Sequence, residues 1–538
     1  MASKPPDLKK ISDRALRLHQ AGDLPEAERL YRQMLAAEPD SFTAHHALGI
    51  IRAQQGRNAE AIEWIGAALT LEPDVAPAWA NHGNLLSAAG RLDEALASYD
   101  KALAIQPEAF EVLLNRARTL LDLQRLEKAL RDYDAVLAIS PDHVEALNDR
   151  GNILRSLKRF EEALASFNKA LALGPGLAET LVNRGVTLSD LRRLEEALAD
   201  YDAALAIKPD SAPALNNRGF TLRELGQLEN ALANYNKTID IQPNYPAALN
   251  NRAKLLCEMD RIREGFADFS RAAAIVRHAA SVRPVADEPP HKTRHDREQN
   301  EYLAESVGKS SSFAHGVELK TAAINRSNDP GAVAARWRTT NPCSVVIDNF
   351  LTVEALEGLR RFCWDNAIWR TVYSDGYLGA FPEQGFACPL LAQIADELRR
   401  AHPAIFHGYP LLYLWAFKYD SRLAGTAVHA DEAAINVNFW ITPDEANLDP
   451  GSGGLVIWDT KPPPDWDFAR YNGEAGPIRD FLTRSGAKSI TVPYRSNRAV
   501  IFDSDLFHQT DTIRFKAGYR NRRINVTLLY GRHRRRSP

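Results

Sequence analysis

The sequence predicts a protein of two parts, an all-α repeat solenoid followed by a β-sandwich or jelly roll with flanking helices. Its 538 residues are too many for one hydrophobic core. In the first half, prolines recur at one constant interval, at Pro39, Pro73, Pro107, Pro141, Pro175, Pro209 and Pro243. In the second half this period is lost, and short β-branched runs alternate with turn residues.

One repeat unit, residues 76–109, reads APAWANHGNLLSAAGRLDEALASYDKALAIQPEA. Two apolar faces at helical spacing are visible, with Trp79, Gly83 and Leu86 on the first helix and Ala95, Tyr99 and Ala102 on the second. Gly90 lies in the expected turn, and Pro107 ends the second helix. The small residues Gly83 and Ala95 should let the two helices approach closely.

This unit resembles the tetratricopeptide repeat (TPR), whose period of about 34 residues is the interval between the prolines. Eight units fit residues 8–279, after an N-terminal tail of residues 1–7. The resemblance implies a solenoid with a concave groove.

A polar residue recurs at the same place in six units, two residues before the Gly83-type position. These residues are Asn81, Asn115, Asp149, Asn183, Asn217 and Asn251. Two helical residues rotate a side chain by roughly 200°, so these side chains should leave the packed face and enter the groove. The pattern is similar to the asparagine ladder of O-linked N-acetylglucosamine transferases, which implies a groove for a protein or peptide chain. The alternative is that asparagine merely suits a solvated helix face.

An arginine follows most of these polar residues, at Arg116, Arg150, Arg184, Arg218 and Arg252. Acids such as Asp100 and Asp134 recur on the second helices. Ion pairs between repeats are the expected use of these charges.

Overall charge and cysteine content argue against several classes of protein. The net charge is −3, which gives no general reason to bind nucleic acid or membranes. No secretory leader or membrane-spanning run is visible, and the four cysteines form no CxxC pair. We therefore expect a cytoplasmic protein, of bacterial type from its repeat style, with no prediction for its oligomeric state.

After the repeats, residues 280–338 are polar and without clear period, and we interpret them as a linker that is partly helical. Residues 339–538 form the predicted second domain, in which a helix over VEALEGLRRFCWDN follows a short first strand. Later strands are expected at LLYLWAFKYD, AINVNFWIT, GGLVIWD, SITVPYR, RAVIFDSD and RRINVTLLYG.

A histidine and an aspartate two residues apart, His429 and Asp431, precede one of these strands. On an extended segment both side chains point the same way, as ligands of one metal ion must. A second histidine, His508, follows much later in the chain, just after a strand-like apolar run, and Arg523 lies beyond it on the last expected strand.

This order of residues resembles the Fe(II)- and 2-oxoglutarate-dependent oxygenases of the prolyl-hydroxylase-like branch. The segments KYD at 418–420 and GSGGLVIWD add softer matches. The resemblance implies a double-stranded β-helix in which His429, Asp431 and His508 hold Fe(II), with 2-oxoglutarate as co-substrate and O2 as oxidant. Related halogenases have a small residue in place of the aspartate, so Asp431 favours hydroxylation.

The co-substrate's distal carboxylate needs a cationic partner, and Arg520, Arg522 and Arg523 compete for this role. Strand alternation places Arg523 on one face with Asn525, whereas Arg522 lies on the other face. We favour Arg523, with Arg522 as the alternative. The family often has Arg-x-Ser where this chain has Arg523-Ile524-Asn525. Tyr419 would donate its hydroxyl to the same carboxylate, unless it is a core aromatic.

The leading hypothesis is an iron- and 2-oxoglutarate-dependent dioxygenase that hydroxylates a protein or peptide delivered by the TPR groove. One alternative is a TPR scaffold with an inactive oxygenase-like domain. Another is a zinc hydrolase built on the same three ligands, although a hydrolase has no use for the downstream arginine.

Overall fold

The structure is a computed structural model that describes residues 7–280, 288–306, 316–423, 425–473 and 475–532. Most of the predicted tail, and residues 281–287 and 307–315 of the predicted linker, lie outside these residues. The chain divides into two compact units, Met1–Asn217 and Arg218–Pro538. None of the described helices has the length and apolar character needed to cross a bilayer.

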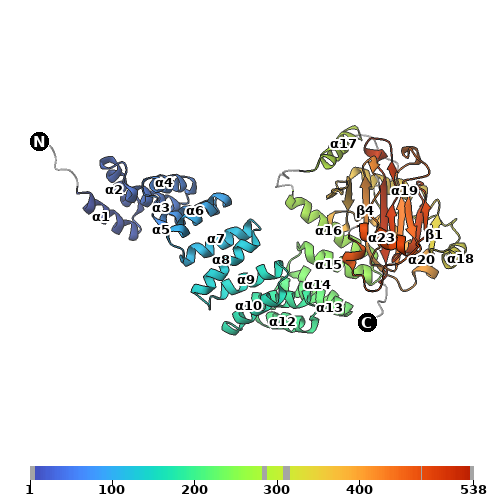
Figure 1. The fold of residues 1–538 in the computed structure, drawn as a ribbon, viewed down its shortest axis with the longest axis horizontal. Helices are drawn as coiled ribbons and strands as arrows, with labels where there is room; N and C mark the ends of the chain where they lie inside the picture. Colours follow the sequence, from blue (N-terminus) through green and yellow to red (C-terminus); the bar gives the residue numbers. More distant parts are fainter. Residues whose placement is uncertain (1–6, 281–287, 307–315, 424, 474, 533–538) are drawn as a thin grey trace. The chain divides into compact units, whose positions relative to one another are not determined.

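Helices fill the described residues of the first unit and continue into the second (Figure 1). They are α1 (Leu8–Gln20), α2 (Leu24–Ala37), α3 (Phe42–Gln54), α4 (Asn58–Leu71), α5 (Ala76–Ala88), α6 (Leu92–Ile105), α7 (Phe110–Asp122), α8 (Leu126–Ile139), α9 (Val144–Ser156), α10 (Phe160–Leu173), α11 (Ala178–Asp190), α12 (Leu194–Ile207), α13 (Ala212–Glu224), α14 (Leu228–Ile241), α15 (Pro246–Glu258) and α16 (Ile262–Ala280). Helices of 13 and 14 residues alternate, as in α5 and α6, and consecutive helices pack as antiparallel pairs.

Close approach within a helix pair depends on glycine, as the sequence predicts. A Cβ atom added to Gly83 on α5 would lie 2.6 Å from the ring of Tyr99 on α6. The same relation recurs between Gly151 and Phe167. Without a side chain at the glycine position, the aromatic ring of the second helix packs directly on the backbone of the first.

Ion pairs join neighbouring repeats of the first unit. Arg116 on α7 contacts Asp132 on α8 at 2.7 Å and Asp100 on the preceding α6 at 2.6 Å. Arg150 on α9 contacts Asp134 on the preceding α8 at 2.7 Å. The predicted use of these arginines between repeats is therefore confirmed for Arg116 and Arg150.

The second unit contains antiparallel sheets flanked by helices (Figure 1). Its strands are β1 (Ser344–Ile347), β2 (Thr371–Tyr373), β3 (Tyr377–Ala380), β4 (Leu411–Tyr419), β5 (Arg422–Leu423), β6 (Ile435–Trp440), β7 (Leu455–Trp458), β8 (Ser489–Val492), β9 (Ala499–Asp503), β10 (His508–Thr510), β11 (Ile513–Arg514) and β12 (Ile524–Tyr530). Its further helices are α17 (Pro290–Ser306), α18 (Pro330–Thr339), α19 (Val353–Asp365), α20 (Pro389–Ala401), α21 (Pro403–Phe406), α22 (Phe468–Tyr471) and α23 (Ala475–Arg484), with short 3-10 turns at Pro382–Gln384, Asp444–Ala446 and Tyr519–Asn521.

Seven strands form the large sheet, in the order β1-β9-β6-β12-β4-β3-β2. A smaller sheet has the order β10-β7-β8, and β11 pairs with β5. All of these pairings are antiparallel. The strands and the helix expected from the sequence are present, whereas the short strands β2, β3, β5, β10 and β11 were not expected.

The central strand β12 shows how the large sheet uses its two faces. Ile524, Val526 and Leu528 face a core that α19 and α20 help to build. Asn525 and Thr527 point to the opposite face, which they share with paired residues of β6 and β4. On that face Trp440 of β6 belongs to a second core, to which the smaller sheet contributes Leu455 and Ile457.

Residues 280–338, the predicted partly helical linker, contain α17 and nearly all of α18 and lie within the second unit, where α17 is packed. On α17, Lys292, His295 and Gln299 are buried. Gln299 donates hydrogen bonds to the carbonyl oxygens of Trp364 and Asn366. The helix buries polar side chains, most of them with hydrogen bonds or ion pairs, although Nε2 of His295 has no hydrogen-bond partner among the described residues, so its polar composition resembles that of a solvated segment.

Candidate metal centre

Backbone pairing brings the two distant parts of the predicted cluster together. His429 lies between β5 and β6, and His508 begins β10. The N–H of each donates to the carbonyl oxygen of the other, at 3.0 and 2.8 Å. The N–H of Asp431 also donates to the carbonyl oxygen of Ser504, at 3.2 Å. The antiparallel bridge between His429 and His508 brings together two residues that lie far apart in the sequence.

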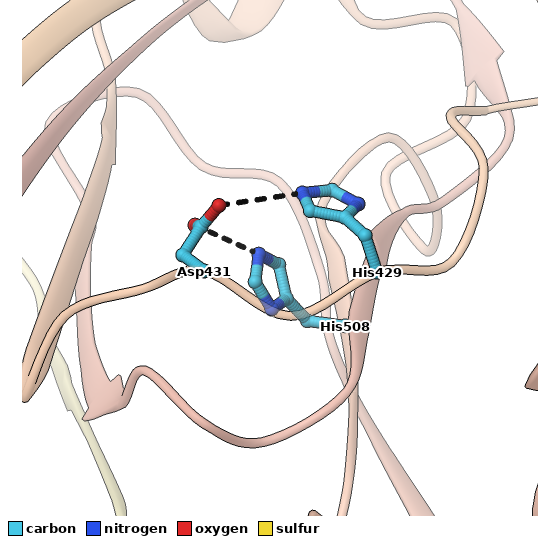
Figure 2. Close-up of side chains that lie close together, drawn as sticks. All are labelled: His429, Asp431 and His508. Carbon is cyan, nitrogen blue, oxygen red and sulfur yellow. Dashed lines mark ion pairs between the residues drawn. The ribbon is translucent and has the colours of Figure 1, made fainter. Parts of the chain in front are cut away.

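The three side chains converge on one point (Figure 2). Nε2 of His429 lies 3.9 Å from Oδ1 of Asp431, and Nε2 of His508 lies 3.4 Å from its Oδ2. One ligand atom from each residue lies within 4.8 Å of the others. These distances leave room for a single ion between the three groups.

Both imidazoles are oriented by their own backbone. Nδ1 of His429 lies 2.9 Å from the carbonyl oxygen of Ala427, and Nδ1 of His508 lies 3.0 Å from that of Leu506. Because a carbonyl oxygen only accepts, each Nδ1 carries the proton in these contacts. Each Nε2 then presents its lone pair to Asp431, which is the form of histidine that binds a metal.

Asp431 is buried and hydrogen-bonded. The side-chain amide of Asn436, on β6, donates to its Oδ2 at 2.6 Å. Burial raises the pKa of Asp431, but the adjoining rings of His508 and His429 and the amide of Asn436 outweigh burial, so its pKa lies below its ordinary value. Burial and the ring of His508 lower the pKa of His429. At neutral pH the cluster therefore offers a carboxylate and a neutral His429, as a divalent ion requires.

A cavity of about 620 Å³ opens beside the three groups, and all three line it. The predicted co-substrate residues Tyr419 and Asn525 line it too. Tyr419 is buried, and its hydroxyl lies 3.3 Å from Oγ1 of Thr510. Asn525 donates to Oδ1 of Asn438 at 2.7 Å, and its own Oδ1 has no hydrogen-bond partner among the described residues.

The two competing arginines differ in their surroundings. Arg522 is ion-paired with Glu298 at 3.0 Å and with Asp420 at 3.1 Å. Arg523 is fully buried, and its guanidinium centre lies 4.8 Å from the ring centroid of Tyr419. Its Nε donates to the carbonyl oxygen of Gly453 at 2.6 Å.

The guanidinium of Arg523 forms no ion pair within contact distance among the described residues, although Asp511 is near enough to interact with it electrostatically, and its Nη1 has no hydrogen-bond partner there. Burial lowers the pKa of Arg523, but an arginine side chain stays protonated in proteins. A buried cation without a counter-ion is costly. This position fits the carboxylate of a bound ligand, whereas the charge of Arg522 is already balanced.

The six predicted groove residues Asn81, Asn115, Asp149, Asn183, Asn217 and Asn251 are all half-buried. Some of them bond the preceding repeat. Asn115 donates to Oδ1 of Asn84 at 3.0 Å, and Asn183 donates to Oδ1 of Asn148 at 3.1 Å. Each of these bonds uses one of the two N–H groups of the amide. These amides therefore help to join repeats, and their contact with a peptide stays a prediction.

Two features near the cluster were missed in the sequence. Asn436 gives no signal of its own, because a polar residue inside a strand is common. The aromatic residues Tyr413, Trp415 and Phe417, which line the cavity, alternate along β4. That alternation was visible in LLYLWAFKYD and could have indicated an aromatic cavity wall.

Two tetratricopeptide-repeat family models match the chain. One matches residues 12–76, 80–143 and 114–178, and the other matches residues 176–244. The N-terminal region therefore carries TPR units, as the regular spacing of the prolines predicts. No curated protein matches this chain.

Solved structures that are similar to the chain are also repeat proteins. A tetratricopeptide repeat protein from Parabacteroides merdae is 23% identical over 44% of this chain and 93% of its own, with a TM-score of 0.39. YrrB, described as a TPR protein with an unusual peptide-binding site, is 28% identical over 34% of this chain and 95% of its own, with a TM-score of 0.31. The C-terminal part of a TPR protein from Cytophaga hutchinsonii is 13% identical over 45% of this chain and 98% of its own, with a TM-score of 0.39.

Proposed function

We propose that this protein is an Fe(II)- and 2-oxoglutarate-dependent dioxygenase that hydroxylates a protein or peptide substrate. One observation carries the proposal. Two imidazole Nε2 atoms and one carboxylate converge at the wall of a cavity, and the buried Arg523, whose Nη1 has no hydrogen-bond partner among the described residues, packs on Tyr419, which lines the same cavity.

His429, Asp431 and His508 would hold the iron. Two imidazoles and one carboxylate on one side of an octahedral ion leave three positions open, which is the arrangement of non-haem iron oxygenases. Bound iron together with 2-oxoglutarate and O2 supplies the oxidising chemistry. The chain's own part is to fix the ligands, which the carbonyl oxygens of Ala427 and Leu506 do by holding both Nδ1 atoms.

Arg523 would bind the distal carboxylate of 2-oxoglutarate through the free side of its guanidinium. A guanidinium donates parallel hydrogen bonds to a carboxylate, which fixes orientation as well as charge. Tyr419 and Asn525 would lie along the same ligand, since both line the cavity. This arginine favours an oxygenase over a zinc hydrolase, which needs only the three ligands and a water molecule.

The fold that we propose for this region is the double-stranded β-helix, or jelly roll. The large sheet and the smaller sheet share one core, and the cluster lies where β10 of the smaller sheet meets the segment before β6 of the large sheet. TPR solenoids offer extended concave binding surfaces. The repeats would therefore bind a polypeptide, which the second unit would oxidise.

Succinate formation tests the proposal. With Fe(II) and O2, the full chain should convert 2-oxoglutarate to succinate. His508→Ala should lower the rate of succinate formation at least about 100-fold because one metal ligand is gone. His407→Ala removes an exposed histidine of the same unit and should leave the rate unchanged.

Three outcomes separate the proposed function from its alternatives. Succinate formation that needs His508 supports the dioxygenase. An absence of succinate under every condition, with the metal bound, favours a TPR scaffold with an inactive domain. Zinc-dependent hydrolysis of esters or amides that survives Arg523→Leu favours the hydrolase.

A further inference from the structure

One wall of the cavity is made of aromatic rings. Its members are Tyr373, Tyr377, Phe381, Tyr413, Trp415 and Phe417, all half-buried. The rings of Tyr373 and Tyr377 stack with centroids 4.5 Å apart, and Tyr377 meets Phe417 edge-on at 5.2 Å. Trp415 lies 6.1 Å from Phe417 on the same strand. The wall is therefore continuous and open to a ligand.

Apart from the two histidines of the cluster, the charged side chains that line the cavity are acidic. The exposed carboxylates of Asp375 and Glu432 line the cavity, outside the three proposed metal ligands. None of the described residues that line the cavity is a lysine or an arginine. Aromatic faces beside carboxylates form a site that attracts cations.

One ring of the wall, that of Tyr413, contacts a cation of this chain that does not line the cavity. Nζ of Lys254, on α15, lies 5.4 Å from the ring centroid of Tyr413 and 2.8 Å from Oε1 of Glu383. The hydroxyl of Tyr413 donates to the other oxygen of Glu383 at 2.8 Å. An ammonium group on this aromatic surface is thus stable within the fold itself.

The position of Lys254 also connects the wall with the repeats. Asn251, the last of the predicted groove residues, precedes Lys254 by three positions on α15. Residues three apart share one face of a helix. The face of α15 that carries Asn251 therefore also carries the lysine that contacts the aromatic wall.

We propose that the substrate is a basic polypeptide segment, with a lysine or arginine side chain lying on this aromatic wall. Binding of this segment is independent of turnover, but the consequence that the substrate is oxidised near that side chain rests on the proposed function. An acidic segment would be repelled by the carboxylate of Asp375. A neutral apolar side chain would cover the rings but gain nothing from the nearby negative charge.

Peptide binding tests the inference without any turnover. The probes are fluorescein-labelled Gly-Ser peptides with a central pair of lysines, arginines, glutamines or glutamates, added to the metal-free full chain. Fluorescence anisotropy should show that the lysine or the arginine peptide binds at least about fivefold more tightly than the glutamine peptide, and the glutamate peptide most weakly.

Two variants assign the binding to the wall. Trp415→Leu should lower the affinity for the basic peptide by roughly 2- to 30-fold, the range expected for cation–aromatic contacts. Asp375→Lys should remove the preference for the basic over the glutamine peptide. Glu445→Gln changes an exposed acid that does not line the cavity and should change nothing. Unchanged thermal unfolding of each variant would show that its fold is intact.

Equal affinity for the basic and the glutamine peptides would overturn the inference, and so would a preference that both Trp415→Leu and Asp375→Lys retain. Succinate formation is then measured separately. Turnover stimulated equally by all peptides would overturn the inference while leaving the dioxygenase in place. Basic-peptide binding that depends on the wall, in a protein without turnover, would support the inference as a binding property and reject the proposed function.

Discussion

At the scale of single residues, the cluster depends on short backbone contacts that need no metal. The carbonyl oxygen that holds Nδ1 of each histidine belongs to the residue two positions earlier, Ala427 for His429 and Leu506 for His508. Each imidazole is therefore oriented by its own loop. Asp431 is oriented by a different element, since its hydrogen-bond donor Asn436 lies on β6.

Replacing Asn436 tests this support of the carboxylate. Asn436→Ala removes the donor to Oδ2 of Asp431 and should lower the affinity for Fe(II) by about 10- to 100-fold, as loss of such partners does in other metal sites. Anaerobic metal titration followed by calorimetry measures the change. Asn521→Ala, an amide that bonds only the backbone of Ala517 in the described structure, is the control. Equal affinities for both variants would show that Asp431 needs no such support.

Two helical glycines of the repeats should respond in opposite directions to alanine. A Cβ atom at Gly83 would lie 2.6 Å from Tyr99, so Gly83→Ala should lower the free energy of unfolding by about 1–3 kcal/mol. At Gly66 the nearest such atom is 3.8 Å away, so Gly66→Ala should raise it by about 0.5–1 kcal/mol. Urea unfolding of both variants measures the difference, and a shared sign would contradict the packing argument.

At this scale the sequence indicates residue types better than contacts. The spacing of His429 and Asp431 and the alternation around Arg523 both follow from extended backbone, which is a local property. The bridge between His429 and His508 depends on pairing between segments that are distant in the chain, which only the family resemblance suggested. The contact of Asn436 with Asp431 left no trace in the pattern.

At the scale of elements, α17 shows why a polar composition misleads. The segment PHKTRHDREQNEYLAES has no apolar stripe, yet His295 is fully buried and its ring lies 5.3 Å from that of Tyr519. The helix packs there because Gln299 donates hydrogen bonds to the backbone of Trp364 and Asn366. In addition, Nδ1 of His295 lies 2.9 Å from the carboxylate of Asp296. Likewise β2 and β3 are too short, at three and four residues, for alternation to identify them.

The burial of His295 predicts a pH dependence of stability. Burial lowers its pKa to about 3, against the partly opposing contact with Asp296. Unfolded, a histidine titrates near pH 6.5, so the unfolded chain binds a proton that the folded chain does not between about pH 6.5 and about pH 3. The stability that neutral His295 contributes is therefore complete above about pH 6.5 and is lost as the pH falls.

When the pH is lowered from about 7.5 to about 5, the titration of His295 should reduce the free energy of unfolding by about 2 kcal/mol. The glutamine of His295→Gln does not titrate. Over this pH interval the free energy of unfolding of the variant should therefore fall by about 2 kcal/mol less than that of the parent protein. Urea unfolding followed by tryptophan fluorescence at both pH values gives the difference between the two proteins, in which other histidines cancel. Parallel pH profiles would show that His295 titrates normally in the folded chain.

At the scale of the whole molecule, the regular proline spacing indicated the repeats but not where the second unit begins. Helices α15 and α16 belong to the repeats by pattern. Yet Cys257 of α15, and Phe266 and Phe269 of α16, lie in the same core as β12. Arg263 of α16 also pairs with Asp396 of α20 at 2.8 Å. A repeat pattern describes how a helix packs on its neighbour, and it does not report what covers the other face of the helix.

This shared core predicts that residue 280 is the wrong place to divide the chain. A fragment of residues 281–538 loses the side chains of Phe266 and Phe269, and losing a single buried phenylalanine costs about 3–5 kcal/mol. Since whole domains are stable by only about 5–15 kcal/mol, we expect this fragment not to fold. A fragment of residues 210–538 keeps α15 and α16 and should retain a cooperative unfolding transition and the near-UV circular dichroism of packed aromatic residues. If 281–538 showed the same transition, α16 would be a covering helix that the second unit does not need.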